Sequence, residues 1–298
     1  MGDFKVDFFI AGAPKCGTSS LAHYLSQHPQ VCFSTPKEPG YFAFNHPESR
    51  LAETEKEYRK SFTCSKKYKQ LKGEGSTIYL YSEEAFKKIR AHNENAKIVL
   101  LLRNPIDLAY SLFLQLRHTE DEKEIEFARA WNQFSERKNK ASDKSLLLYK
   151  DVVSLGSQVK ELLSIIPRDQ VFIGFLEDFK ENPANTYKEI LGFLHLQDDN
   201  REEFEVINSS GDHRNIFMKH LFLFVTKNRM LYRLAISIVR ILKIPNWLIN
   251  SLHKSPNQKT KKMLPSDLRK GIALELENEV KILIGLMNRD LSIIWKDF

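Results

Sequence analysis

The residues best suited to chemistry lie between two glycines near the start of the chain. Four residues separate Gly12 from Gly17, and Lys15 is one of them. Three hydroxyl residues follow at 18–20, with the sequence Thr-Ser-Ser. The backbone N–H groups of such a loop, together with the positive end of a following helix, bind anions, and phosphate is the usual guest. We therefore expect an anion-binding loop here.

The flanking residues predict the elements that hold this loop. Residues 8–11 are apolar and indicate a strand, and Leu21, Tyr24 and Leu25 share one face of a predicted helix. Strand, loop and helix follow each other as in a P-loop NTPase, whose motif is G-x-x-x-x-G-K-[ST]. Thr18 stands where that motif has its lysine, and the lysine of this chain comes three residues earlier. The cation would therefore meet a phosphate chain at a different point.

A second polar group follows the apolar run 97–102, which lacks alternation, as buried parallel strands do. The run ends in Arg103, where a P-loop NTPase needs an acid to hold Mg²⁺. The planar fork of an arginine suits a phosphate monoester, and a structural salt bridge is the alternative. Asn104 and Pro105 predict an N-cap and first helical residue. Ser111, about two turns along that helix, is expected to face the same side as Arg103.

The loop 36–42 has the sequence Pro-Lys-Glu-Pro-Gly-Tyr-Phe and holds Glu38 between two prolines. A carboxylate in that setting is unusual for an idle surface loop, and the alternative is a solvated glutamate beside a core Tyr-Phe pair. His46 and His118 compete with it as candidate bases, since histidine is the commoner choice and neither has an obvious core role.

Composition excludes several classes of function. The 298 residues carry 45 Lys and Arg against 38 Asp and Glu, a net charge of +7, without a run typical of a nucleic-acid arm. The three cysteines, Cys16, Cys32 and Cys64, lack metal-site spacing, so we expect no metal and free thiols in a reducing compartment. No signal peptide and no transmembrane segment are expected, which predicts a cytoplasmic protein for which membrane association is the minor alternative.

The remaining pattern predicts a three-layer α/β fold: a central parallel sheet with helices on both faces and the phosphate loops at the carboxyl ends of the strands. Further strands are expected at 31–33 and 171–176. Helices are expected within 48–70, from Ser82 as N-cap, within 120–140, and at 151–166, 184–194 and from 266 onward. Residues 1–298 are expected to form one domain. Its amphipathic segment 220–250, within a helical region 216–265, packs on the domain, caps an acceptor cleft or meets a membrane.

Several segments resemble, in chain order, those of sulfotransferases that use 3′-phosphoadenosine 5′-phosphosulfate (PAPS), especially the heparan-sulfate-type and related bacterial enzymes. The matching segments are P-K-C-G-T-S-S-L at 14–21, K-E-P-x-[FY]-F at 37–42, G-E-x-[ST]-x-x-Y-L at 73–80, R-x-P-x-x-x-x-x-S at 103–111, E-D-[FL]-x-x-x-P at 177–183, a region like H-N-x-S-x-x-x-R at 207–214, and N-R-D-L at 288–291. One position departs: the glycosaminoglycan enzymes commonly carry a lysine where this chain has Gly75, which puts a glycan-polymer acceptor in doubt.

The resemblance implies sulfuryl transfer from PAPS to a hydroxyl or amine of a small-molecule acceptor, a natural product or a sugar, with Glu38 as catalytic base and Lys15 at the leaving oxygen. It implies these donor-binding residues: Lys15, Cys16, Gly17, Thr18, Ser19 and Ser20 for the 5′-phosphosulfate, and Arg103, Ser111 and Arg214 for the 3′-phosphate. Two alternatives are a P-loop nucleotide kinase and a nucleotide-binding module without catalysis.

Overall fold

The computed structural model describes residues 4–65, 70–82, 84–139, 145–205, 231 and 264–298. Arg214 and nearly all of the predicted cap 216–265 lie outside these residues, so both stay predictions, as does the single domain over 1–298. Within the described part of the chain, no helix combines the length and hydrophobicity that crossing a bilayer requires.

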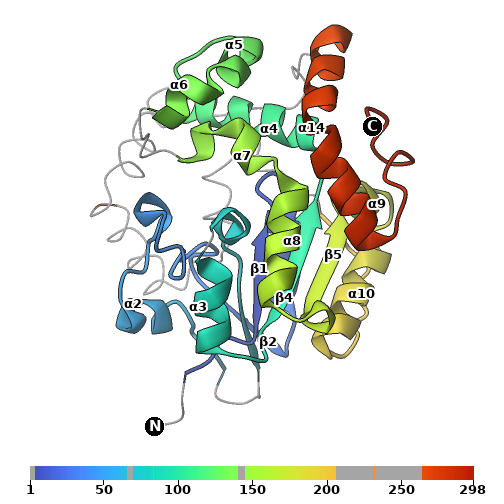
Figure 1. The fold of residues 1–298 in the computed structure, drawn as a ribbon. Helices are drawn as coiled ribbons and strands as arrows, with labels where there is room; N and C mark the ends of the chain where they lie inside the picture. Colours follow the sequence, from blue (N-terminus) through green and yellow to red (C-terminus); the bar gives the residue numbers. More distant parts are fainter. Residues whose placement is uncertain (1–3, 66–69, 83, 140–144, 206–230, 232–263) are drawn as a thin grey trace.

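The centre of the fold is a sheet of five parallel strands in the order β2-β3-β1-β4-β5 (Figure 1). The strands are β1 Phe8–Gly12, β2 Val31–Phe33, β3 Leu71–Glu74, β4 Lys97–Leu102 and β5 Val171–Phe175. Every strand pair is parallel, and all five residues of β1 are buried. The chain leaves β1 towards β2 and β3 and later crosses to β4 on the other side. Open α/β sheets bind ligands at the carboxyl ends of strands where the order reverses, which here is beside β1.

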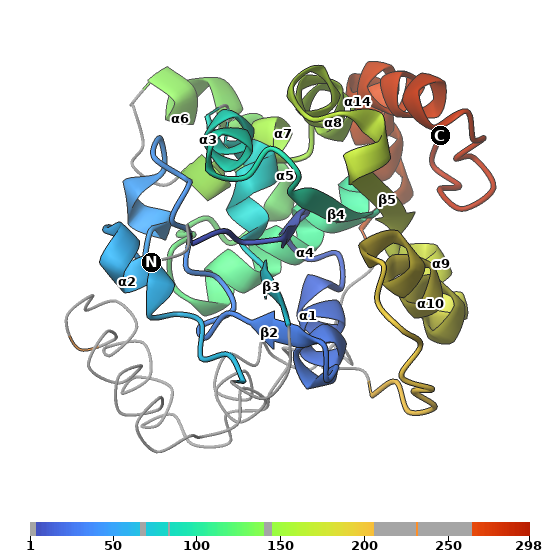
Figure 2. The same cartoon turned by 90° about the horizontal axis from the view of Figure 1, so that it is seen from below.

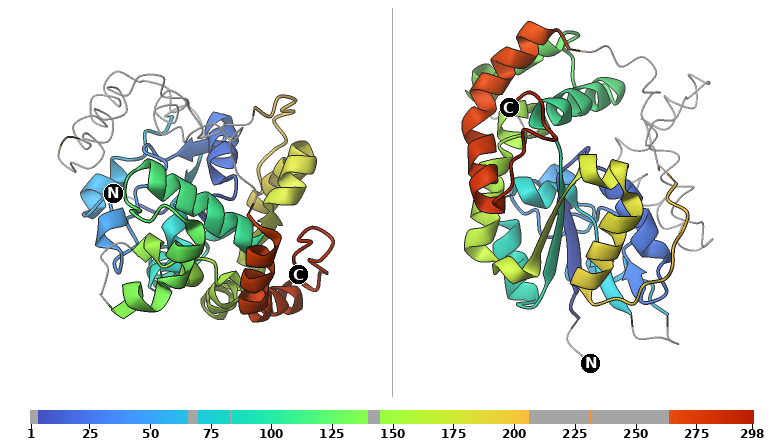
Figure 3. Two further views of the ribbon diagram at one scale, coloured as in Figure 1. Left: turned by 90° about the horizontal axis from the view of Figure 1, so that it is seen from above. Right: turned by 90° about the vertical axis from the view of Figure 1, so that its right-hand side faces the viewer.

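Helices cover both faces of the sheet, which confirms the predicted three-layer α/β fold. Seen edge-on, α3, α8 and α14 lie on one side, and α1 and α10 lie on the other (Figures 2 and 3). The helix bounds are α1 Thr18–Gln27, α2 Glu55–Arg59, α3 Ala85–His92, α4 Pro105–His118, α5 Phe127–Asn132, α6 Phe134–Asn139, α7 Tyr149–Val152, α8 Leu155–Ile165, α9 Leu176–Glu181, α10 Pro183–Leu194 and α14 Ser266–Met287.

Two of the predicted helix starts have opposite outcomes. Asn104 caps α4 as predicted: its side-chain oxygen accepts hydrogen bonds from the amides of Ile106 and Asp107, and Pro105 is the first helical residue. The prediction of Ser82 as an N-cap is wrong, because α3 begins at Ala85 and the Ser82 hydroxyl donates to Asn45 Oδ1 at 2.5 Å instead. The Ser82 hydroxyl thus binds a residue distant in sequence and does not cap the helix.

The sequence pattern missed one strand and overestimated two helices. β3 was not predicted, because its sequence, Leu-Lys-Gly-Glu, is short and mostly polar. Gly73 in β3 is required by packing, since a Cβ there would lie 2.0 Å from Cζ of Phe8. The predicted helix within 48–70 is reduced to α2 and a 3₁₀ turn at Pro47–Ser49, and the predicted helix 151–166 is divided into α7 and α8.

The expectation of three free thiols is wrong. Cys32 and Cys64 form a disulfide, with their Cα atoms 5.1 Å apart, and only Cys16 is a free and buried thiol. The bond joins β2, at the edge of the sheet, to the segment that follows α2. A separation of 32 residues carries no sign of this pairing, because the folding of the intervening chain brings the two cysteines together.

Glu74, the last residue of β3, is a buried carboxyl group surrounded by hydroxyl groups. The hydroxyls of Tyr58, Tyr79 and Ser76 lie around it but form no hydrogen bond of ordinary geometry with its oxygens. Burial raises its pKa from 4.5 to about 7 and outweighs these hydroxyl groups, which favour the ionised form. The folded state therefore holds a proton on Glu74 between pH 4.5 and about 7, where the unfolded state has released it.

We predict that Glu74→Gln makes the stability of the protein less dependent on pH. Because the folded state binds the extra proton, the wild-type free energy of unfolding falls as the pH rises through this window, by about 1–3 kcal/mol. The Glu74→Gln variant is neutral at this position and lacks this loss. Its free energy of unfolding in urea should therefore rise relative to that of the wild type between about pH 5 and pH 8. Glu202→Gln, an exposed change, is the matched control. Parallel curves for the wild type and Glu74→Gln would contradict a protonated Glu74.

Candidate functional site

The predicted anion loop connects β1 to α1 and is fixed at both ends. At its start, the amide of Ala13 donates to the carbonyl of Leu101 in β4 at 2.8 Å. Lys15 and Gly17 both have positive φ, 62° and 83°. Gly17 precedes α1 directly, and a Cβ there would lie 2.8 Å from Cδ1 of Leu176. The conformation and the packing both require glycine, and they set the first turn of α1 at the end of the central strand.

The start of α1 carries the N–H groups that an anion needs. The amide of Ser20 donates to the carbonyl of Gly17 at 3.0 Å, so the amides before it are those left without an intrahelical partner. Thr18 is buried and Ser19 is partly exposed. The structure therefore brings together all the predicted loop residues at one helix N-terminus.

Cys16 is a packing residue of this loop and not a nucleophile. Its thiol is fully buried and donates to the carbonyl of Pro14 at 3.3 Å. Burial raises its pKa to about 12, despite the opposing effect of the nearby Arg103 charge. The thiol therefore stays protonated at neutral pH, and an anion in the loop would meet the Cys16 backbone only.

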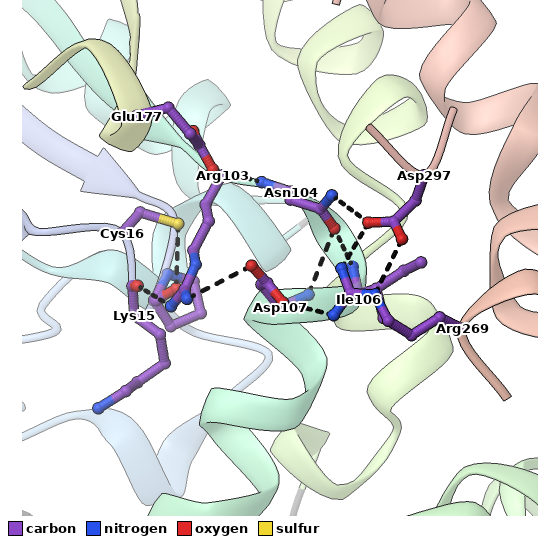
Figure 4. Close-up of polar contacts among 10 residues, drawn as sticks. Lys15, Cys16, Arg103, Asn104, Ile106, Asp107, Glu177, Arg269 and Asp297 are labelled. Carbon is purple, nitrogen blue, oxygen red and sulfur yellow. Dashed lines mark hydrogen bonds and ion pairs between the residues drawn. The ribbon is translucent and has the colours of Figure 1, made fainter. Parts of the chain in front are cut away.

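Arg103 lies at the end of β4, beside the anion loop (Figure 4). Its Nη1 donates to the carbonyl of Lys15 at 3.4 Å, and its Nη2 lies 3.8 Å from Asp107. Both contacts are long, and Asp107 also accepts a 2.9 Å hydrogen bond from Arg269. The Lys15 side chain extends away from the guanidinium group (Figure 4). One cationic side chain, Lys15, thus belongs to the loop, and a second, Arg103, lies beside it; the two side chains extend in different directions.

Ser111 lies on α4, one turn after Asp107, and these two positions share a helix face. Since Asp107 faces Arg103, α4 carries the partly exposed Ser111 on the side of the predicted partner. Lys180 was not predicted and also belongs to this region. Burial lowers the pKa of Lys180, and the Arg103 charge lowers it further.

The loop that carries Glu38 is attached to the end of β3. The carbonyl of the preceding residue, Lys37, accepts hydrogen bonds from the amide of Gly75 at 3.0 Å and from the hydroxyl of Ser34 at 3.1 Å. The Glu38 side chain is 47% exposed, and the hydroxyl of Thr77 lies 3.5 Å from each of its oxygens. A fixed backbone thus presents a solvent-accessible carboxylate at the same edge of the sheet as the anion loop.

Lys37 connects this carboxylate to the anion loop and was not predicted as a site residue. Its Nζ lies 2.8 Å from Oε1 of Glu38 and 3.3 Å from Oγ1 of Thr18. Sequence placed it beside Glu38, but the direction of its side chain depends on how the two loops pack. Through Lys37 the structure brings Glu38 and the first turn of α1 together.

The histidines that competed with Glu38 have other positions. His46 is buried, its Nε2 lies 3.0 Å from the carbonyl of Tyr81, and its ring stacks on that of Tyr81 with 5.3 Å between centroids. The expectation that it has no core role is therefore wrong. His118 is the last residue of α4, at the opposite end of that helix from Arg103.

The acidic pair after β5 makes structural contacts. Glu177 accepts a hydrogen bond from the amide of Asn104 at 3.2 Å, and Asp178 binds both terminal nitrogens of Arg289 at 2.5 and 2.9 Å. In the described ranges, no cluster of three or more His, Cys, Asp or Glu residues could hold a metal ion. The two acids tie α9 to α4 and to the segment after α14.

The sequence is similar to a family profile and to several known proteins. The family profile described as "Sulfotransferase domain" matches residues 5–220, more than half of the chain. A "Membrane-associated sulfotransferase kil1" of Dictyostelium discoideum is 31% identical over 109 residues, 36% of this chain and 22% of that protein. A human "Bifunctional heparan sulfate N-deacetylase/N-sulfotransferase 3" is 26% identical over 195 residues, 63% of this chain and 22% of that protein. The chain thus spans less than a quarter of either relative.

A solved structure extends the likeness over nearly the whole fold. The sulfotransferase from Alicyclobacillus acidocaldarius superimposes with a TM-score of 0.71 at 24% identity, covering 98% of this chain and 99% of that chain. This likeness shows that the two chains share a fold.

Proposed function

The chain belongs to the sulfotransferase family, and from this premise we propose that it transfers a sulfuryl group from PAPS to a hydroxyl or amine of a small acceptor. The observation that best supports the proposal is the 3.3 Å contact of Lys37 with Thr18, because it connects the anion loop to the loop of Glu38. A donor phosphate on α1 would thereby lie within reach of a carboxylate that can accept a proton.

The residues present suit both charged ends of PAPS. We assign the 5′-phosphosulfate to the loop 14–20, with Lys15 and the helix-start amides as donors. We assign the 3′-phosphate to Arg103 and Ser111, because an arginine with two long contacts retains donor capacity for a dianion. Arg214 is proposed as a further 3′-phosphate contact. A 3′-phosphate pocket would select PAPS over nucleotides that lack this group.

The proposed reaction is an in-line transfer that needs no metal. The acceptor oxygen or nitrogen attacks sulfur, and the bond from sulfur to the bridging oxygen of the 5′-phosphate breaks with its electron pair left on that oxygen. Glu38 takes the proton that the acceptor loses. Lys15 and the amides of the first turn stabilise the negative charge that develops on the departing oxygen.

The acceptor is the part of the proposal that the site defines least. One relative is named for heparan sulfate, a sugar polymer, whereas Gly75 departs from the lysine that the resemblance associates with glycan-polymer acceptors. We therefore propose a small molecule, a natural product or a sugar, and no nucleic-acid partner. A panel of sugars, phenols and lipids with radiolabelled PAPS identifies the class.

The predicted location in the cytoplasm stays a proposal, and part of its support is gone. Disulfides such as Cys32–Cys64 are favoured in oxidising compartments, so the free-thiol argument no longer applies. Cell fractionation tests the predicted absence of membrane association, because it separates soluble from membrane-associated protein.

The first prediction from this proposal separates a sulfotransferase from a kinase. The product nucleotide, 3′-phosphoadenosine 5′-phosphate (PAP), should bind with a Kd of about 1–100 μM, because the phosphates meet a helix terminus and two cationic side chains. Calorimetry in EDTA and in Mg²⁺ should give the same affinity, and ATP should bind more weakly. A requirement for Mg²⁺, or a preference for ATP, would contradict the proposal in favour of a kinase. Binding without turnover of any acceptor in the panel would favour a non-catalytic module.

The second prediction tests Arg103. Arg103→Ala should weaken PAP binding by about 2–4 kcal/mol, the scale for loss of a partner of a desolvated charge. Adenosine 5′-phosphosulfate lacks the 3′-phosphate, so its affinity should barely change. Arg59→Ala, at an exposed side chain of α2, is the control for loss of an arginine. Equal losses for both nucleotides would show that Arg103 only supports the loop through Lys15.

The third prediction concerns Glu38 as the base. Glu38→Gln keeps the shape of the side chain and removes its basicity, so kcat should fall at least about 10²-fold while PAP affinity stays nearly constant. His118→Ala should cost far less, and His46→Ala should act through stability, since His46 packs on Tyr81. An active Glu38→Gln enzyme beside an inactive histidine variant would overturn the base assignment and leave the donor assignment intact.

A further inference from the structure

Lys37 lies between the two halves of the proposed reaction. Its side chain is only 13% exposed, and its Nζ contacts Oε1 of Glu38 at 2.8 Å and Oγ1 of Thr18 at 3.3 Å. One ammonium group thus contacts the carboxylate assigned as base and the first helical residue of the anion loop. Its charge lies where PAPS and the sulfuryl acceptor would meet in the proposed reaction.

The absence of a side chain at Gly75 leaves room for the Lys37 side chain. A Cβ at Gly75 would lie 3.1 Å from Cε and 3.2 Å from Cγ of Lys37, and 3.3 Å from Cζ of Phe33. These distances are shorter than ordinary carbon contacts, so a side chain at this position would push the lysine stem aside. Gly75 has no positive φ that would require glycine. The absence of a side chain there leaves room for the Lys37 stem and for the ring of Phe33.

The Lys37 backbone is fixed as well. Its carbonyl accepts hydrogen bonds from the amide of Gly75 and the hydroxyl of Ser34. From this fixed backbone the side chain reaches Thr18 and Glu38, and its contacts with both place the ammonium group between them. A charge that is positioned before the ligand arrives needs little reorganisation during reaction.

We propose that Lys37 is a second catalytic cation, which contacts the sulfonate oxygens of the donor, and that Gly75 makes room for it. The inference rests on the proposed function and deepens it. The sulfonate and the Glu38 carboxylate are both negative, so bringing them together costs electrostatic energy that an ammonium group between them offsets. Lys37 keeps its proton throughout: the acceptor proton goes to Glu38, and the electron pair of the broken S–O bond goes to the 5′-phosphate.

A purely structural role for Lys37 makes a different prediction. If Lys37 only held the two loops together, its loss would weaken every ligand of the anion loop alike. If it contacts the sulfonate, its loss affects PAPS, which carries the sulfonate, and spares PAP, which lacks it. The two nucleotides are otherwise identical, so their comparison isolates the group in question.

The experiment measures PAPS and PAP affinity by calorimetry, and PAP release from PAPS with water as acceptor, for the wild type and four variants. Lys37→Gln should weaken PAPS by about 10- to 100-fold, the scale of one hydrogen bond to a charged group, and slow PAP release by at least as much. PAP affinity should change less than about 3-fold. Lys37→Arg, which keeps the charge, should retain part of the activity. Lys87→Gln, an exposed lysine on α3, is the control.

Gly75→Ala tests the same idea without removing the lysine. It should lower both the affinity for PAPS and the rate of PAP release, by less than Lys37→Gln does. The affinity for PAP should stay unchanged. Equal losses of PAP and PAPS in the Lys37 variants, or no loss of either, would overturn the catalytic role. A wild-type protein that binds neither nucleotide would instead overturn the proposed function, and this inference with it.

Discussion

Burial of β1 between β3 and β4 is the constraint on which the site depends. All five residues of this strand are buried, and its neighbours pair with it on both sides. The anion loop therefore starts from a fixed point, and the hydrogen bond from Ala13 to Leu101 ties that point to β4. Because Arg103 directly follows β4, the same packing that buries β1 also places its guanidinium group beside the loop.

The other side of β1 positions Glu38. Phe8 packs over Gly73, which keeps β3 close, and the end of β3 holds the Glu38 loop through Gly75. The site thus has a donor half, supported by β1 and β4, and a carboxylate half, supported by β3. Lys37 contacts both halves, at Thr18 and at Glu38.

Features that depend on neighbours in sequence could be predicted from the sequence. The anion loop is one, because its glycines, lysine and helix start follow each other directly. The Asn104 cap is another, because its partners are the next residues along the chain. The parallel sheet followed from apolar runs at 8–11, 97–102 and 171–176.

Features that depend on packing between distant parts of the chain could not be predicted from the sequence. The four residues of β3 show no strand pattern, and only the ring of Phe8 explains Gly73. The partner of His46 is 35 residues away, and the disulfide joins cysteines 32 residues apart. Lys37 was visible in the sequence beside Glu38, but its contact with Thr18 exists only once two loops meet.

The ion-pair network behind Arg103 has a consequence for the order in which the site can be assembled. Asp107 accepts a hydrogen bond from Arg269, and Asn104 donates to Asp297 at 2.8 Å, so α4 begins against residues from α14 and the segment after it (Figure 4). A ribosome makes the anion loop, β4 and α4 long before it makes these partners. Asp107 is shared between Arg103, four residues before it in the chain, and Arg269, which is made much later. The surroundings of the Arg103 guanidinium group are therefore complete only after all five strands of the sheet have been made.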